Sequence, residues 1–347
     1  GCTALVVTAL GINDSIKNVV NDQFDTIMVY DYNISFSEGQ NNVERENFIE
    51  SYSDVLTECV FVTEGEVELI QDTKIKKASV VATDDPNISH VIGLSSKSGN
   101  LLYPSYGNVL INDRLAEEFH IKEGDYVTIR VNGIENADLR VAGIFKNYMN
   151  NYLFMTGETY EAFLKKEPIY QNAYASTDHE DLYAVSASLS KDDKVTRVSV
   201  LYDMRVMVAN MMESLNQIIW LVIAFAAALS FVVIYNLNNI NITERAREIA
   251  TIKVIGFYDR ETQQYVFRES FILTLLGTLI GLGFGKLLHM FVMSRIKVDA
   301  VSFKEQIFGT SYLLSALITL LITFLVNFML RKKINKIDMA DSLKSVE

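Results

Sequence analysis

Few residues in this 347-residue chain have the types and spacing that catalysis would need. No serine lies in a GxSxG elbow, and the acidic residues are dispersed rather than paired. Only Cys2 and Cys59 carry thiols, too few for a disulfide-built fold. The histidines lie far apart in the sequence, without an HExxH pair, at His90, His120, His179 and His289. The sequence therefore predicts no catalytic residues and no metal site.

One dipeptide, Gly285-Lys286, resembles the end of a phosphate-binding loop. Such a loop requires glycine at position 280 and serine or threonine at position 287. This chain has Ile280 and Leu287 there. No other Walker motif occurs in the sequence. We therefore predict that this chain does not hydrolyse ATP itself, and that any ATP hydrolysis linked to its function comes from another chain.

The most informative polar segment is residues 242–257, between two long apolar stretches. Thr243 can cap a helix that starts at Glu244, and Gly256 fits the left-handed residue that ends it. The pattern places four apolar residues on one face: Ala246, Ile249, Ile252 and Ile255. It leaves three charged residues off that face: Arg245, Glu248 and Lys253. We predict a short amphipathic helix here.

This amphipathic helix could rest on lipid or dock into another protein. Glu244 and Glu248 stand beside Arg245 and Arg247. That mixture of signs suits a protein groove better than an anionic bilayer surface.

Three stretches are long and apolar enough to span a membrane: 218–237, 271–293 and 312–330. The second contains Gly277, Gly281 and Gly285 at a spacing of four, which permits close helix packing. The alternative is that glycine is simply frequent in membrane helices. Lys286 is the one Asp, Glu, Lys or Arg within these spans. With His289 it lies within two or three turns of the outer end, and we expect its side chain to extend toward the outer surface.

Basic residues predict the orientation of the spans. The loop after the first span and the tail 331–347 are rich in arginine and lysine, whereas the loop between the second and third spans has only Arg295, Lys297 and Lys304. We therefore expect the first loop and the tail to be cytoplasmic. Residues 12–205, with 32 acidic against 17 basic residues, are then extracytoplasmic. This charge balance disfavours a nucleic-acid binder.

The extracytoplasmic part is predicted to be a mixed α+β domain. We expect strands at 24–36, 108–111, 126–131, 137–145 and 196–203, and a hairpin over 66–82. We expect helices at 43–56, 112–121, 160–167 and 181–195, with Asn112 as a cap and Asn132-Gly133 as a hairpin turn. Residues 206–217 are expected to continue the first span as a stalk helix.

The first eleven residues are apolar but too short to span a membrane, and a basic signal-peptide region is absent from them. We interpret residues 1–11 as the outer end of a truncated first transmembrane helix. The expected fold is then a membrane α-helical bundle, with three complete spans and the end of another, that carries a mixed α+β extracytoplasmic domain.

The run 244–257 resembles the loop after the second transmembrane helix of FtsX/MacB-type ABC transporter permeases. Glu269-Ser270 before the glycine-rich span and the tail 336–344 resemble the same family. Residues 109–129 and 141–145 are similar to the MacB-type extracytoplasmic domain. The opening 1–16 resembles the segment after the first span in large Gram-positive members, which often carry two modules, so this chain resembles a C-terminal module.

The resemblance implies a non-catalytic permease subunit that pairs with a second permease module, sits in membrane lipid, and recruits a separate ABC ATPase holding ATP and Mg²⁺. ATP-driven motion would move the extracytoplasmic domain (mechanotransmission), exporting or extracting a peptide or lipid-like cargo. Residues 242–257 would be the coupling helix, and its expected ATPase contacts are Thr243, Glu244, Arg245, Arg247, Glu248, Ile249, Ile252, Lys253, Gly256 and Phe257. The alternative is a membrane-anchored regulator of a cell-wall hydrolase or histidine kinase that transports nothing.

Overall fold

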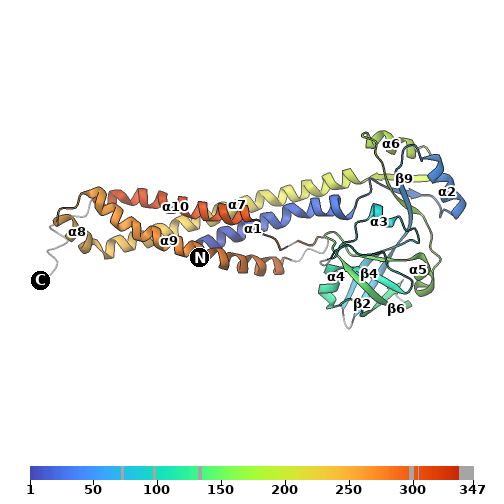
Figure 1. Ribbon diagram of the computed structural model, residues 1–347, viewed down its shortest axis with the longest axis horizontal. Helices are drawn as coiled ribbons and strands as arrows, with labels where there is room; N and C mark the ends of the chain where they lie inside the picture. The colour runs from blue at the N-terminus through green and yellow to red at the C-terminus, as the bar shows by residue number, and fades with distance from the viewer. Residues whose placement is uncertain (72–73, 97–98, 132–134, 297–300, 304, 336–347) are drawn as a thin grey trace. The chain divides into compact units, whose positions relative to one another are not determined.

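The computed structural model describes residues 1–71, 74–96, 99–131, 135–296, 301–303 and 305–335. The chain divides into two compact units. The helical unit contains Gly1–Lys17, Met212–Ile296 and Lys304–Glu347. The mixed unit contains Asn18–Met211 and Lys297–Phe303. Figure 1 labels the helices and strands of both units.

The mixed unit is built on nine strands in the order β3-β7-β4-β6-β5-β2-β8-β1-β9. Their bounds are β1 Tyr32–Phe36, β2 Glu58–Gln71, β3 Lys74–Ala82, β4 Asn108–Asn112, β5 Tyr126–Val131, β6 Glu135–Phe145, β7 Tyr152–Met155, β8 Asn172–Ser176 and β9 Val195–Val200. The long strand β2 serves two sheets, because its first residues pair with β8 and its later residues pair with β3 and β5.

Pairing of β2 with β3 closes strands β3, β7, β4, β6, β5 and β2 into a ring. Burial alternates along β5, where Val127, Ile129 and Val131 face the core. This is the period of two that predicted a strand here. Leu69 and Leu139 join them in one aliphatic core. The barrel therefore has a packed interior and no unpaired edge within the ring.

The remaining strands form a second, antiparallel sheet of β9, β1, β8 and the start of β2. Helix α2 (Asn42–Ser51) connects β1 to β2, and α6 (Leu182–Leu189) connects β8 to β9. Two β-α-β units are thus interleaved. Tyr32, Phe36 and Phe48 lie in a second core that is separate from the barrel core.

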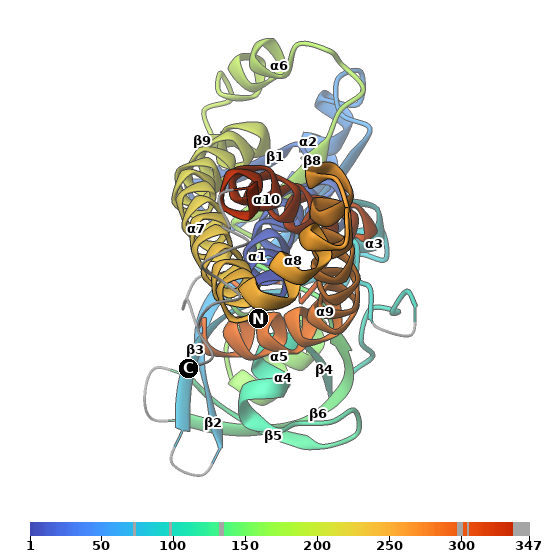
Figure 2. The same cartoon turned by 90° about the vertical axis from the view of Figure 1, so that its left-hand side faces the viewer.

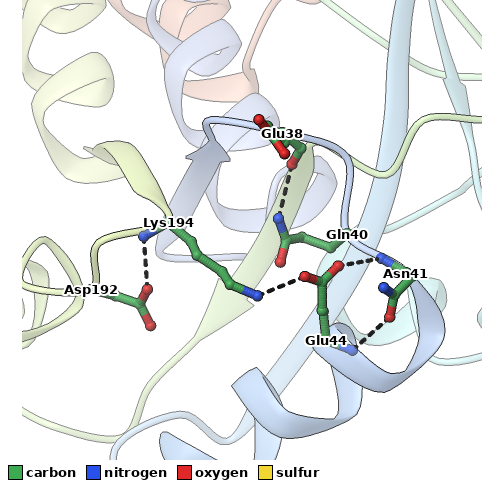
Figure 3. A network of polar contacts seen from close by, with 6 residues as sticks. All are labelled: Glu38, Gln40, Asn41, Glu44, Asp192 and Lys194. Carbon is green, nitrogen blue, oxygen red and sulfur yellow. Dashed lines mark hydrogen bonds and ion pairs between the residues drawn. The ribbon is translucent and has the colours of Figure 1, made fainter.

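Figure 3 shows the start of α2, where Asn41 and Glu44 form a capping box. Asn41 Oδ1 accepts a hydrogen bond from Glu44 N at 3.0 Å, and Glu44 Oε2 accepts one from Asn41 N at 3.0 Å. Glu44 Oε1 accepts from Lys194 Nζ at 2.8 Å. The bond from Lys194, and then that from Asn41, lower the pKa of Glu44 below its ordinary value. This contact joins the two interleaved β-α-β units.

The expected strand over 24–36 is only partly correct. β1 covers Tyr32–Phe36, whereas Asp22–Ile27 is a π-helix, η1. Gln23 explains the difference, because its Nε2 donates to Asn147 Oδ1 at 3.0 Å and its Oε1 accepts from Tyr148 N at 2.9 Å. These buried contacts outweigh the strand propensity of the segment.

Other element boundaries also differ from expectation. The helix expected over 181–195 ends at Leu189, and the strand expected over 196–203 is β9, which ends at Val200. Asn112 precedes α4 (Asp113–Phe119) but does not cap it, because its Oδ1 accepts from Tyr152 N at 3.4 Å. The Asn132-Gly133 turn lies outside the described residues, although β5 and β6 pair on either side of it. The remaining helices are α3 (Ile88–Val91) and α5 (Gly157–Leu164).

The helical unit is formed by long helices that Figure 2 shows nearly end-on. Their bounds are α1 Cys2–Asn21, α7 Leu201–Glu244, α9 Asp259–Arg295 and α10 Gly309–Asn335, with the short α8 Ala246–Val254 between α7 and α9. Three of the described helices, α7, α9 and α10, are long and apolar enough to cross a membrane. Each contains one of the expected spans. Helix α1 continues past residue 11 to Asn21.

Helix α7 is continuous over 44 residues, from the end of β9 to the loop before α8. At 1.5 Å per residue its length is about 66 Å. The expected stalk, residues 206–217, is part of this same helix. Arg205 near its start forms two hydrogen bonds with Asp25 of η1, at 2.6 and 3.2 Å.

The segment between α9 and α10 contributes to the mixed unit. Val301 forms an antiparallel bridge with Met149, and Ser302 N donates to Tyr148 O at 2.7 Å. Val301 and Phe303 also pack in one cluster with Tyr148. Residues that follow the second span therefore belong to the same compact unit as residues 18–211.

Candidate functional site

The predicted amphipathic helix exists as α8, but it begins later than expected. Thr243 and Glu244 are the last residues of α7, and Arg245 occupies the N-cap position without a side-chain cap bond. Thr243 Oγ1 instead donates to Asn239 O at 2.8 Å. The expected cap is wrong because Ile242 is buried against α10, and this packing keeps α7 helical through Thr243.

The end of α8 is formed as the sequence predicts. Gly256 has a φ of 108°, in the left-handed region that glycine adopts without strain. Gly256 N donates to Lys253 O at 3.1 Å, and Phe257 N donates to Ile252 O at 3.4 Å. These two bonds are the Schellman arrangement that ends a helix.

The apolar face of α8 is rotated relative to the expected one. Ile249 and Ala250 are buried, and Ile249 packs with Val326 and Leu330 of α10. Ile255, which the sequence places on the same face, is 71% exposed. The prediction failed because the inward face is selected by α10, which the periodicity of α8 alone does not reveal.

Lys253 shows the largest departure from expectation. Its side chain is only 7% exposed, although it was expected to stay polar and accessible. Its Nζ donates to Ile334 O at 3.0 Å and to Asn335 O at 3.3 Å, and lies 3.1 Å from Asp259 Oδ1. A lysine near the last carbonyls of α10 satisfies acceptors that have no partner within the helix. Lys253 therefore fixes α8 to α10 and to the first residue of α9.

Two further polar contacts hold the helix ends together around α8. Arg245 Nη1 forms an ion pair with Glu269 of α9. Lys333 Nζ of α10 donates to Thr243 Oγ1 at 2.7 Å. Every long helix that flanks α8 is thus tied to α8 or to its preceding residue, so a displacement of α8 must displace these helix ends as well.

The outward side of α8 and the following loop form one exposed surface, which we call the coupling surface. Its apolar members are unusually accessible, with Ile255 at 71% and Tyr258 at 78% exposure. It consists of Arg247, Glu248, Thr251, Val254, Ile255, Phe257 and Tyr258. The ATPase contacts expected from the sequence did not include Thr251, Val254, Ile255 and Tyr258, because only the docked orientation of α8 shows that they face outward.

Two of the three predicted packing glycines contact α1. A Cβ on Gly281 would lie 2.8 Å from Thr3 Cβ, and a Cβ on Gly285 would lie 2.6 Å from Val7 Cβ. Thr8 Oγ1 donates to Gly285 O at 3.2 Å across the same crossing. Glycine permits this close approach of two helix backbones.

Gly277 does not pack in this way. A Cβ there would meet no atom within 4 Å among the described residues. Gly277 instead lines a cavity of about 510 Å³ together with Cys2, Asn238 and Ser270. Among the described residues Gly277 is therefore not part of the crossing with α1, and its expected packing role stays a prediction.

The interior of the helical unit contains small polar side chains. Ser270 Oγ donates to Asn238 Oδ1 at 3.0 Å, and Asn238 Nδ2 donates to Asn327 Oδ1 at 2.9 Å. At the other end His289 is buried and lies 3.0 Å from Ser15 Oγ through its Nε2. Lys286 is exposed, as expected. The hydrogen bonds of Ser270, Asn238, Asn327, His289 and Ser15 link α1, α7, α9 and α10, and each group finds a hydrogen-bonding partner.

The remaining chemically active side chains do not converge. Among the residues that the structure describes, no group of three or more His, Cys, Asp and Glu could hold a metal ion. Burial raises the pKa of the Cys59 thiol to about 12, which keeps it protonated and unreactive. His90 pairs with Glu58 at 2.8 Å on the exposed surface. The arrangement is therefore one of contacts between helices rather than of reacting groups.

The chain is similar to solved structures of two extracytoplasmic regions. The periplasmic region of MacB from Actinobacillus actinomycetemcomitans is 15% identical, with a TM-score of 0.37, over 55% of this chain and 98% of that one. The extracellular domain of the ABC-type transporter YknZ from Gram-positive bacteria is 13% identical, with a TM-score of 0.34, over 48% of this chain and 98% of that one. No curated protein matches the sequence.

Two family models match the sequence itself. Residues 2–199 match the MacB-like periplasmic core domain, and residues 220–339 match the C-terminal domain of FtsX-like permeases. The first match covers the barrel, the second sheet and α1, and the second match covers α8 and the three candidate spans. The chain belongs to the FtsX/MacB-type permease family.

Proposed function

We propose that this chain is the permease subunit of an ABC transporter in which a separate ATPase binds the coupling surface and moves the mixed unit by mechanotransmission. The observation that carries the proposal is the continuity of α7. One unbroken helix of 44 residues follows strand β9 directly and ends one residue before α8. A displacement of α8 can be transmitted along α7 toward β9, because α7 contains no Pro or Gly at which the helix would bend.

The composition of the spans supports transmission of force rather than conduction. Ionisable groups inside membrane helices usually mark the path of a charged substrate or ion. Lys286 is the one Asp, Glu, Lys or Arg of the three predicted spans, and it is exposed rather than inside the bundle. The interior instead contains Ser, Thr, Asn and Gly residues that hold helices together, and its buried histidine, His289, is engaged with Ser15 of α1. Cargo, whether peptide or lipid-like, would then be handled by the mixed unit.

The contact of residues 301–303 with Tyr148 and Met149 supports the proposed orientation. This loop connects the second and third spans, so it lies on the opposite side of the membrane from α8. Because it packs on the mixed unit, the mixed unit is also opposite α8. The basic residues around α8 and at the end of α10 then support a cytoplasmic position for α8 and an extracytoplasmic position for the mixed unit.

Charge reversal on the coupling surface tests ATPase binding. We expect the double variant Arg247→Glu/Glu248→Arg to lose co-purification of the cognate ATPase, because both side chains are exposed and neither forms an ion pair among the described residues. Lys191→Glu, an exposed change in the mixed unit, should leave co-purification intact. Undiminished ATPase capture by the double variant would refute the assignment of α8.

A second variant separates binding from transmission. Lys253→Met removes the bonds from α8 to α10 and Asp259 while leaving the coupling surface unchanged. We expect the ATPase to remain bound, but its nucleotide-dependent motion should no longer change spin-label distances within the mixed unit. Unchanged distance changes in this variant would show that α8 does not act through its docking contacts.

A further inference from the structure

A groove at the α8 end of the helical unit is lined by the first part of α9 and the last part of α10. It encloses about 360 Å³. Its lining includes both guanidinium groups and aromatic rings. The guanidinium groups belong to Arg260 and Arg268 of α9 and Arg331 of α10, and rings belong to Phe271 of α9 and to Phe324 and Phe328 of α10. We call it the arginine–phenylalanine groove.

The three arginines of the groove are exposed, and no ion pair to any of them occurs among the described residues. The acids near the start of α9 are already engaged. Asp259 lies against Lys253, Glu261 accepts from Tyr258 N at 2.9 Å, and Glu269 pairs with Arg245. Among the described residues, the groove therefore gathers three positive charges that no acid neutralises, which favours an anionic ligand.

The phenylalanine rings of the groove are so exposed that contact with water would be unfavourable. Phe324 is 65% exposed, Phe328 is 58% exposed and Phe271 is 50% exposed. All three lie within the predicted spans 271–293 and 312–330. Their natural surroundings are therefore hydrocarbon chains of the membrane. The ligand that contacts them must be apolar where it meets these rings.

Charge and apolarity are ordered along the helices. Phe324, Phe328 and Arg331 recur at i, i+4 and i+7, so they form one stripe on α10 about 10 Å long. The guanidinium of Arg331 lies 5.1 Å from the centre of the Phe328 ring, at the end of the stripe nearest α8. On α9, Arg268 precedes Phe271 by three residues, with the charge again toward α8. A ligand must thus present its anion near the helix ends and its apolar part deeper.

We infer that the arginine–phenylalanine groove binds an anionic phospholipid, with the phosphate among Arg260, Arg268 and Arg331 and an acyl chain along the phenylalanines. Guanidinium groups bind phosphate oxygens through paired hydrogen bonds, and basic pockets between membrane helices bind anionic headgroups. A soluble anion would use the arginines but not the rings, and an acidic protein segment would leave the rings unexplained. Assignment to the inner leaflet rests on the orientation given in the proposed function.

Native mass spectrometry of the purified full chain, without its ATPase, tests this inference. Dioleoyl phosphatidylglycerol is titrated against dioleoyl phosphatidylcholine as the neutral probe. We expect tighter binding of phosphatidylglycerol, reduced on the order of a hundredfold in Arg260→Gln/Arg268→Gln/Arg331→Gln and roughly fivefold in Arg331→Gln alone, if each charge acts independently. Lys332→Gln is the matched control, since Lys332 is adjacent, exposed and outside the groove.

Substitution of the phenylalanines tests the apolar part of the site independently of the arginines. Phe324→Ala/Phe328→Ala should weaken phosphatidylglycerol binding severalfold while leaving the weak binding of glycerol phosphate unchanged, because glycerol phosphate has no acyl chain. Leu325→Ala/Met329→Ala, an exposed pair at the same depth on another face of α10 and outside the groove, should leave phosphatidylglycerol binding intact.

Three results would overturn the inference. Equal binding of the two lipids would show that the groove does not select an anion. Equal losses in Arg331→Gln and Lys332→Gln would show diffuse attraction rather than a site. Unchanged lipid binding in the triple variant, with ATPase capture lost, would identify the groove as a protein contact. Loss of ATPase capture in the Arg247/Glu248 double variant has no bearing on lipid binding, so this inference and the proposed function fail separately.

Discussion

The two units of this chain differ in the side chains that they bury and expose. In the barrel, the interior contains large aliphatic residues such as Leu69, Leu139 and Leu153, which are fully buried. In the helical unit, many leucines and phenylalanines point outward, and Leu279 and Phe284 are more than 60% exposed. Its buried positions include an aliphatic cluster near α8 and also small polar residues, with Ser311, Ser315, Thr319 and Thr323 forming a stripe along α10.

This difference in buried and exposed side chains indicates that water surrounds the mixed unit and lipid surrounds the helical unit. In water, burial of aliphatic surface drives packing. In lipid this driving force between helices is absent, so close backbone approach and hydrogen bonds within the bundle must hold the helices together. The difference also assigns roles, because the mixed unit is stabilised internally by its cores, whereas the helical unit is held by contacts that a small helix displacement can alter.

The largest expected effect comes from removing one leucine from each environment. Leu139→Ala should cost about 2–5 kcal/mol of local stability, because it leaves a cavity in the barrel core. Leu279→Ala should cost less than about 0.5 kcal/mol, because its side chain faces lipid or detergent. Hydrogen exchange of the full chain in detergent measures both. Equal losses of protection would contradict the assignment of opposite solvents.

A smaller effect is expected from the glycines of α9. Gly285→Ala should destabilise the helical unit by about 1–3 kcal/mol, because the added Cβ overlaps Val7. Gly283→Ala, on the open side of the same turn, should be stabilising by up to about 1 kcal/mol through helix propensity. Unfolding in sodium dodecyl sulfate compares the two variants. If both respond alike, α1 does not cross α9 at Gly285.

The smallest effect concerns the exposed pair at the start of α2. Because the pKa of Glu44 is lowered in the folded state, its stabilising contribution is present above the ordinary carboxyl pKa and is lost as pH falls through the lowered value. Lys194→Gln should raise the pKa of Glu44 toward the ordinary range, whereas Lys191→Gln should not. Carboxyl-carbon nuclear magnetic resonance of the full chain follows this titration. A Glu44 pKa that is insensitive to Lys194 would show that the pair of Figure 3 does not persist in solution.

Sequence periodicity anticipated most elements because their burial is local in origin. The three apolar runs lie within α7, α9 and α10, and alternation located β5 and the β2–β3 hairpin. Failures occurred where a distant residue decides the local structure. Gln23 bonds to Asn147 and Tyr148, more than 120 residues away, and this buried contact accompanies a π-helix in a segment with strand propensity.

The candidate site divides in the same way. Gly256 as the end of α8 and Gly281 and Gly285 as packing positions follow from residue type and spacing. The cap at Thr243 and the orientation of Ile255 were predicted wrongly, since both depend on how α8 and the end of α7 pack on α10. Lys253 could not be distinguished from the other lysines of the segment until Ile334 and Asn335 were found beside it.

By itself the sequence determined the membrane spans and the separate α+β domain, because composition and periodicity reflect which residues each segment can bury. It also determined the family motifs and the absence of a Walker motif, because these depend only on residue identity and spacing. Only the tertiary structure decided that β2 closes a barrel while pairing in a second sheet, and which residues form the coupling surface. It also decided that, among the described residues, three arginines without an ion pair lie beside exposed phenylalanine rings. Those outcomes depend on which distant segments meet, and that choice is made by packing and hydrogen bonding across the whole chain rather than by any local pattern.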